Sequence, residues 1–247
     1  MRFLLLFSLS IILNSNVAFA QPIDLSRTQV RAQLIPRKVT IISSELSARI
    51  KDMDLHKGDE FKFGDALVAF DCAVETAQRQ RAQAKLEMDK KTVAVNERLA
   101  ELHSISILEV ERSLAEVKIS QADLAIMNAV LDKCIILAPF SGKVVNLYAR
   151  QYQYVQAGSQ LLEIIDVSDL EVEVIVPSRW LVWLKLGEPF TIVIDETGKE
   201  YSAVIARLGA TIDPVSQTLE IMGKIESNSD RLLSGMSGIA QFSPPSH

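Results

Sequence analysis

The sequence predicts a mostly-β α+β fold, in which an α-helical coiled-coil hairpin is inserted into one small β-domain and a small β-barrel follows. Three observations predict this fold. One short β-pattern occurs twice, at residues 47–70 and 141–164. A long stretch typical of helices separates the two copies. Several short alternating segments with turn signals follow the second copy.

Residues 1–20 are predicted to be a secretory signal peptide with cleavage after Ala20. Arg2 is followed by an apolar run at residues 3–13 and by the small-residue end Ala18-Phe19-Ala20. The run is too short for a comfortable membrane span, although an uncleaved N-terminal anchor remains an alternative. We therefore expect the mature protein outside the cytoplasm, which in a bacterium means the periplasm.

The two copies of the β-pattern align at one constant offset of 94 residues, from Ile50 to Val144. The matched pairs are Ile50/Val144, Met53/Leu147, Phe61/Val155, Gly64/Gly158, Leu67/Leu161 and Phe70/Ile164. Neither copy is long enough to bury a core alone, so we expect the copies to pack on each other. Tyr152 stands where the first copy has Gly58, which predicts that this turn differs between the copies.

Two long helices are predicted between the copies. Residues 73–102 contain no Gly or Pro and are rich in Ala, Gln, Lys, Glu and Arg; after a break at residues 103–106 a second helix runs to about residue 133. A 3-4 spacing predicts thin apolar seams along residues 74, 77, 81, 84, 88, 91, 95, 98 and 102, and along residues 107, 110, 114, 117, 121, 124, 128 and 131. Such seams indicate an antiparallel coiled-coil hairpin that projects about 40–45 Å. Two helices lying flat on a globular core would need a wider apolar stripe.

The C-terminal part is predicted to form a small closed barrel of five or so strands. The strand segments are residues 170–176, 191–194, 201–208, 219–225 and 238–242, with a short helical segment at residues 177–186. Trp180 and Trp183 are expected on the buried face of that segment. Glu171 and Glu173 alternate with valines and are expected on a solvated strand face. A further strand is expected near residues 30–35, in the lead-in before the first copy.

Composition excludes several functions. The formal net charge is −5 and the chain has no basic patch, so no nucleic-acid partner is expected. Its histidines, His56, His103 and His247, have no recognisable catalytic partner, and no metal-binding spacing of His or Cys occurs. Its methionines are scattered, as expected of core residues. We therefore expect no catalytic residues, no metal and no cofactor, and in particular no lipoyl or biotinyl group.

Cys72 and Cys134 are the only cysteines, and they lie at the two predicted ends of the helical insertion. The ends of an antiparallel hairpin are neighbours in space, and the expected compartment is oxidising. The sequence therefore predicts a Cys72–Cys134 disulfide at the hairpin base. Two buried free thiols are the alternative, because cysteine packs well as a small apolar residue.

Three segments resemble the periplasmic adaptor, or membrane fusion protein, family of efflux and type I secretion systems. They are Ile136-Leu-Ala-Pro-Phe-Ser-Gly-Lys-Val144, Asp213-Pro-Val-Ser-Gln-Thr218 and Leu232-Leu-Ser-Gly-Met236. The resemblance implies a split lipoyl-like (barrel-sandwich hybrid) domain at residues 39–71 and 135–166. It further implies an α-helical hairpin at residues 72–134 and a β-barrel domain at residues 167–243.

The same resemblance implies the partners. Family members link an inner-membrane pump, of the RND or ABC class, to a TolC-type outer-membrane channel, and they form homo-oligomers, usually hexamers. Arg98, Leu102 and Ser106 match the channel-contacting tip of the hairpin, although the gap from Leu102 to Ser106 is about three residues shorter than in multidrug adaptors. Ser106 and Glu109 also have the spacing of a capping box, which would make the tip rigid. The segments after the signal peptide and past the barrel are too short for a further, membrane-proximal domain, so the barrel and its loops are expected to contact the pump.

A second function fits the same features. A periplasmic scaffold or assembly factor could use this fold without exporting anything, and the short ends favour it slightly. A carrier-domain enzyme component is opposed by the signal peptide and by the helical insertion, which occupies the turn where such domains carry the modified lysine.

Overall fold

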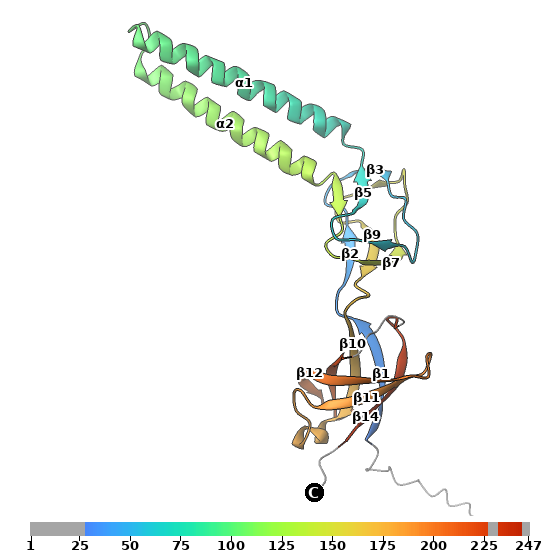
Figure 1. The fold of residues 1–247 in the computed structure, drawn as a ribbon. Helices are drawn as coiled ribbons and strands as arrows, with labels where there is room; N and C mark the ends of the chain where they lie inside the picture. Colours follow the sequence, from blue (N-terminus) through green and yellow to red (C-terminus); the bar gives the residue numbers. More distant parts are fainter. Residues whose placement is uncertain (1–27, 227–231, 244–247) are drawn as a thin grey trace, which may run out of the picture.

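The computed structural model describes residues 28–226 and 232–243, which form a split β-module, a long helix pair and a β-barrel (Figure 1). The predicted signal peptide, residues 1–20, lies outside the described residues. The β-module lies between the helix pair and the barrel, so the three parts follow one another along the molecule. No helix in the described ranges is both long and apolar enough to cross a membrane.

The split β-module consists of two four-stranded sheets, each built from both copies of the repeat. The half of the module that contains the first copy, with the strand before it, supplies β2 (Val39–Ser43), β3 (Ala48–Asp52), β4 (Glu60–Phe61) and β5 (Ala66–Phe70). The half that contains the second copy, again with the strand before it, supplies β6 (Ile135–Leu137), β7 (Gly142–Leu147), β8 (Tyr154–Val155) and β9 (Gln160–Ile165). The strand orders are β2-β9-β7-β4 and β6-β5-β3-β8. The equivalent strands of the two halves are β2 and β6, β3 and β7, β4 and β8, and β5 and β9. Replacing each strand by its equivalent converts the first order into the second, so each sheet combines strands of both halves.

The matched apolar positions form one core, as the repeat predicts. Ile50, Leu161 and Ile164 are completely buried, and Leu67 is 2% exposed. All belong to a single hydrophobic cluster that contains residues of both copies. Because each sheet contains strands of both copies, neither copy can form its sheet alone.

The prediction that the Gly58 and Tyr152 turns differ is wrong. Both residues have positive φ, 93° for Gly58 and 69° for Tyr152. The Gly58 N–H donates to the Val144 carbonyl (2.8 Å), and the Tyr152 N–H donates to the Ile50 carbonyl (2.9 Å). The partners are themselves a matched pair, so the backbone of the turn is conserved between the copies while the side chain is not. In each sheet, this hydrogen bond joins one copy to the other and accompanies the left-handed conformation, even where a tyrosine must adopt it.

We therefore predict that Tyr152→Gly is more stable than Tyr152→Ala by about 1 kcal/mol, because a left-handed backbone disfavours any residue with a Cβ atom. Tyr152 is 72% exposed, so little packing is lost in either variant. The measurement is the urea midpoint of each variant. An alanine variant as stable as the glycine variant would contradict the backbone argument.

The two predicted helices are observed as α1 (Ala73–Glu101) and α2 (Ile107–Asp132), which lie side by side (Figure 1). The predicted seam of α1 is wrong, because Val74, Met88, Val95 and Leu102 are all between 57% and 64% exposed. The buried and half-buried positions of α1 that follow a 3-4 spacing are instead Glu75, Arg79, Ala82, Leu86, Asp89, Val93, Asn96 and Ala100. Those of α2 that share the same 3-4 spacing are Val110, Ser113, Val117, Ser120, Leu124, Met127 and Leu131.

Polar residues occupy the seam of α1 because they find partners there. Arg79 donates from Nε to Asn128 Oδ1 (3.2 Å), and Asp89, only 6% exposed, accepts hydrogen bonds from Lys85 and Ser120. A buried polar group with a partner is tolerated, so the periodicity of apolar residues alone did not select the contact face. The most apolar stripe of α1 remains on the surface.

The barrel is closed by six strands, in the order β1-β10-β13-β12-β11-β14. Five follow the split module: β10 (Leu170–Pro177), β11 (Pro189–Ile194), β12 (Glu200–Asp213), β13 (Thr218–Ile225) and β14 (Ser237–Phe242). The sixth is β1 (Gln29–Pro36), which was expected as a strand but not as part of the barrel. It pairs with both β10 and β14 and so joins two strands that would otherwise be open edges. The range 167–243 therefore omits one strand of the barrel.

The segment after β10 is a short 3₁₀ helix, η1 (Ser178–Val182), rather than a helix through residue 186. Trp180 is 5% exposed and lies edge-on to Phe242, with ring centroids 5.5 Å apart. Trp183 packs against Trp180 at 5.3 Å. These contacts confirm the expected buried face. Val182, in contrast, is 87% exposed.

Candidate functional site

The tip of the helix pair, residues 98–108, is an exposed end with apolar side chains. Leu102 follows the last residue of α1 and is 60% exposed, while Ile107 and Leu108, the first residues of α2, are each 73% exposed. We call these three residues the apolar tip. Sequence reasoning identified Leu102 but missed Ile107 and Leu108 as surface residues, because Ile107 was assigned to the seam. Two adjacent apolar residues directly after a helix N-cap are the signal that could have indicated them.

The other two predicted tip residues lie at the same end with different partners. Arg98 pairs with Glu101 (Nη1 to Oε2, 2.6 Å), and both side chains are mostly exposed. Ser106 occupies the N-cap position of α2 with an extended backbone, but its side chain makes no cap hydrogen bond. The predicted capping box is therefore wrong. The N–H of Glu109 is satisfied by the Ser106 carbonyl instead (3.1 Å), so the hydroxyl remains available to solvent or a partner.

At the opposite end of the helix pair, the structure contains a disulfide between Cys72 and Cys134, whose Cα atoms lie 6.2 Å apart. Cys72 precedes α1, and Cys134 follows α2 and is 7% exposed. The Phe70 N–H donates to the Cys134 carbonyl (2.8 Å), which continues the pairing of β5 with β6 up to the disulfide. The bond thus lies where the helices join the core of the split module.

A polar cluster lies in the middle of the helix pair. Lys85 Nζ donates to Asp89 Oδ2 (2.8 Å), Glu116 Oε1 (2.9 Å) and Ser120 Oγ (2.9 Å). The Ser120 hydroxyl, 1% exposed, also donates to Asp89. The hydrogen bond from Lys85, followed by that from Ser120, lowers the pKa of Asp89 below its ordinary value. Hydrogen bonds to Asp89 and Glu116 raise the pKa of Lys85. Both groups are therefore charged at neutral pH, and the cluster connects α1 to α2.

We predict that Asp89→Asn lowers the melting temperature of the helices at neutral pH and much less in acid. A carboxyl group with a lowered folded-state pKa stabilises the fold above its unfolded pKa, about 3.9, and this stabilisation is lost as the pH falls through the lower folded value. The measurement is thermal unfolding followed by far-UV circular dichroism, once at neutral pH and once in acid. Asp123→Asn, an exposed change on α2, is the matched control. A difference between wild type and Asp89→Asn that stays constant into acid would contradict the prediction.

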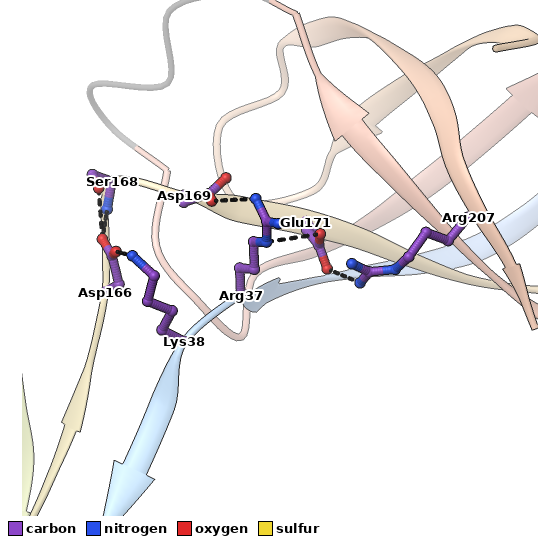
Figure 2. A network of polar contacts seen from close by, with 7 residues as sticks. All are labelled: Arg37, Lys38, Asp166, Ser168, Asp169, Glu171 and Arg207. Carbon is purple, nitrogen blue, oxygen red and sulfur yellow. Dashed lines mark hydrogen bonds and ion pairs between the residues drawn. The ribbon is translucent and has the colours of Figure 1, made fainter. Parts of the chain in front are cut away.

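A network of charged residues joins the two chain segments that run between the split module and the barrel (Figure 2). One segment contains Arg37 and Lys38, between β1 and β2; the other runs from Asp166 to Asp169, between β9 and β10. Lys38 Nζ donates to Asp166 Oδ2 (3.0 Å), and Arg37 Nη1 donates to Asp169 Oδ2 (3.1 Å). Together with Ser168, Glu171 and Arg207, these residues form the junction network.

Glu171 corrects a sequence-based expectation. It is buried at 7% exposure rather than solvated, whereas Glu173 is half-buried. Arg207 of β12 donates to Glu171 Oε2 (2.5 Å), and Arg37 Nε lies 3.9 Å from Glu171 Oε1. The register of β12 against β13 shifts between Ile205 and Arg207, and such an irregularity can redirect a side chain. Neither the shift nor the burial of Glu171 has a local sequence signal.

In residues 28–226 and 232–243, no cluster of three or more His, Cys, Asp or Glu side chains could hold a metal ion. The arrangement instead places an exposed apolar tip at the end of a long helix pair. A site of this kind can bind another macromolecule.

Curated proteins with similar sequences include export proteins. No protein-family profile matches the chain. The chain is 26% identical over 231 residues to the macrolide export protein MacA of Yersinia pestis, covering 80% of this chain and 62% of that protein. It is 23% identical over 226 residues to the nodulation protein NolF of Rhizobium meliloti, covering 85% and 62%. The chain thus spans less than two thirds of the length of these relatives.

Solved structures share the fold. A chimera of MacA carrying the α-hairpin domain of Pseudomonas aeruginosa MexA has a TM-score of 0.76 at 20% identity, covering 86% of this chain and 78% of the chimera. The membrane fusion protein Spr0693 of Streptococcus pneumoniae has a TM-score of 0.75 at 12% identity, covering 88% and 99%. Together, these relatives and structures indicate a membrane fusion, or periplasmic adaptor, protein family. Within this adaptor fold, the apolar tip is at the end of the helix pair farthest from the barrel (Figure 1).

Proposed function

We propose that the chain is a non-enzymatic periplasmic adaptor of a tripartite efflux or type I secretion system. It links an inner-membrane pump of the RND or ABC class to a TolC-type outer-membrane channel. The observation that carries the proposal is the apolar tip, because three large apolar side chains are exposed at the far end of a projecting helix pair. Exposed apolar groups of this kind are typical of surfaces that bind another protein.

In this proposal, residues 39–71 and 135–166 form the split lipoyl-like domain and residues 72–134 form a coiled-coil hairpin. The two-copy core and the 3-4 spacing of buried positions along both helices support these assignments. The hairpin reaches the channel with the tip residues Arg98, Leu102 and Ser106, together with Ile107 and Leu108. The barrel, completed by β1, contacts the pump through its loops.

Homo-oligomerisation, with six copies as the family resemblance implies, is part of the proposal. Val74, Met88 and Val95 form an exposed stripe on α1, and Ile119 and Ile126 are 54% and 56% exposed on α2. A neighbouring copy would cover these apolar side chains, because the partner helix within the chain leaves them in solvent. Side-by-side helix pairs would then surround a conduit for the exported solute.

Photo-crosslinking in cells tests whether the chain links a pump to a channel. We expect a probe at Leu102 to capture an outer-membrane channel and a probe at Met88 to capture another copy of the chain. A probe at Val182 should capture an inner-membrane transporter; this exposed position is preferable to buried Trp180 on the same 3₁₀ helix. A probe at Val193, on the side of the barrel, serves as the control. If Leu102 captures only other copies or nothing, the channel-docking role is wrong and the scaffold function takes its place.

A further inference from the structure

The junction between the split module and the barrel is an almost continuous two-stranded ribbon. The β2/β9 ladder ends at the pair Val39/Ile165, and the β1/β10 ladder begins at the pair Pro36/Leu170. Between them, the Asp166 N–H donates to the Lys38 carbonyl (2.9 Å), and the Arg37 N–H donates to the Asp169 carbonyl (3.0 Å). Backbone pairing therefore continues from one part of the molecule into the next.

Two residues interrupt the ribbon on one strand only. Arg37 and Lys38 are consecutive, whereas their partners Asp169 and Asp166 are separated by Val167 and Ser168. Extra residues on one strand of an antiparallel pair bend that strand and increase its twist. These two extra residues make Val167 and Ser168 the point of the ribbon where bending is easiest.

Side chains hold the ribbon on both sides of this bulge. On the side of the split module, Lys38 pairs with Asp166; on the barrel side, Arg37 pairs with Asp169 and lies near Glu171. The side chains of Asp166 and Glu171 are only 6% and 9% exposed, whereas those of Lys38 and Arg37 are each 54% exposed. Separation of the strands would leave the buried Asp166 carboxylate without its cation, which is unfavourable, whereas Glu171 would keep its pair with Arg207. The ion pairs therefore oppose fraying of the ribbon.

Asp166 also fixes the conformation of the bulge. Its Oδ1 atom accepts hydrogen bonds from the Ser168 N–H (2.9 Å) and the Ser168 hydroxyl (2.6 Å), while Oδ2 accepts the bond from Lys38 (Figure 2). Burial raises the pKa of Asp166, but the hydrogen bonds from Ser168 and Lys38 outweigh this effect and leave the pKa below its ordinary value. One charged carboxylate thus connects the bulge, its own strand and the opposite strand.

We propose that the junction is a hinge whose bending is confined to Val167 and Ser168, and that Asp166 is the positioning residue that sets its angle. The bond from Ser168 determines how the chain turns through the bulge. The bond from Lys38 prevents the two strands from separating when the hinge bends. The orientation of the barrel relative to the split module, and through it to the helix pair, then depends on this one side chain.

Distance measurements by electron paramagnetic resonance test the hinge in the full chain. Spin labels at Val145→Cys in the split module and Val193→Cys in the barrel report the distance between the two parts, since both positions are at least 40% exposed. The native cysteines form a disulfide and are not labelled without reductant. In Asp166→Ala, the population outside the wild-type distance range is expected to rise on the order of tenfold, about 1.4 kcal/mol.

Two controls separate the hinge from general destabilisation. Asp195→Ala removes an ion pair with Arg31 (2.7 Å) that lies wholly within the barrel, and it should leave the distance distribution unchanged. Labels at Ile175→Cys and Val193→Cys, both in the barrel, should show no broadening in Asp166→Ala. Ser168→Ala, a milder change, should broaden the inter-part distance in the same direction if Asp166→Ala fails to fold. Distributions identical to wild type in the folded variants would overturn the proposal.

Discussion

Replacing Cys72 and Cys134 with serine is expected to lower the free energy of unfolding by about 4 kcal/mol. The disulfide links residues 62 apart in the sequence, and its loss increases the conformational entropy of the unfolded chain. The effect should fall on the helix pair and the adjoining core. Urea unfolding measures it, with far-UV circular dichroism for the helices and tryptophan fluorescence for the barrel. Both tryptophans lie in the barrel, so the fluorescence transition should move least.

Wild-type protein in reducing agent is the matched control, and it should unfold at the same urea concentration as the double serine variant. Alkylation of denatured, unreduced protein should label no thiols. Two labelled thiols, or equal midpoints for the oxidised and reduced protein, would contradict the prediction and favour two buried free cysteines.

Leu67→Ala and Leu161→Ala are each expected to cost about 2–5 kcal/mol, because both side chains are almost fully buried in one core. The two residues occupy equivalent positions in the two copies of the repeat. Each sheet of the split module contains strands of both copies, so damage to one copy must reach the other. Hydrogen exchange in either variant should therefore show lost protection in both copies.

Phe63→Ala provides the control within the same module, because Phe63 is 74% exposed and its truncation should have little effect on stability. If hydrogen-exchange protection were lost only in the copy that carries the leucine substitution, the prediction that both copies share one core would be contradicted. It would show instead that each copy is stable by itself.

The helices and the break between them were predicted within a residue or two, because they depend on local properties. The absence of Gly and Pro and the abundance of strong helix formers define α1, and Ser106 marks the start of α2. The repeat likewise identified matching strands, since the alternation of buried residues within a strand is local. These features follow from neighbouring residues in the chain.

The contact face of α1 could not be predicted in this way. Asp89 is unfavourable in a seam unless Lys85 and Ser120 are both in reach, and Ser120 belongs to the other helix. Periodicity favoured the stripe of Val74, Met88 and Val95, which the structure leaves exposed. An apolar stripe indicates burial but not whether the partner belongs to the same chain.

The sequence by itself determined the two copies of the β-pattern, the long helices inserted between them and the strands that follow. Only the tertiary structure decided that β1 closes the barrel, that Glu171 is buried, and that the apolar tip includes Ile107 and Leu108. The physical reason is the range of the interactions. Backbone propensity and side-chain periodicity act between near neighbours, whereas β1 meets β14 and Glu171 meets Arg207 only after the chain between them has folded.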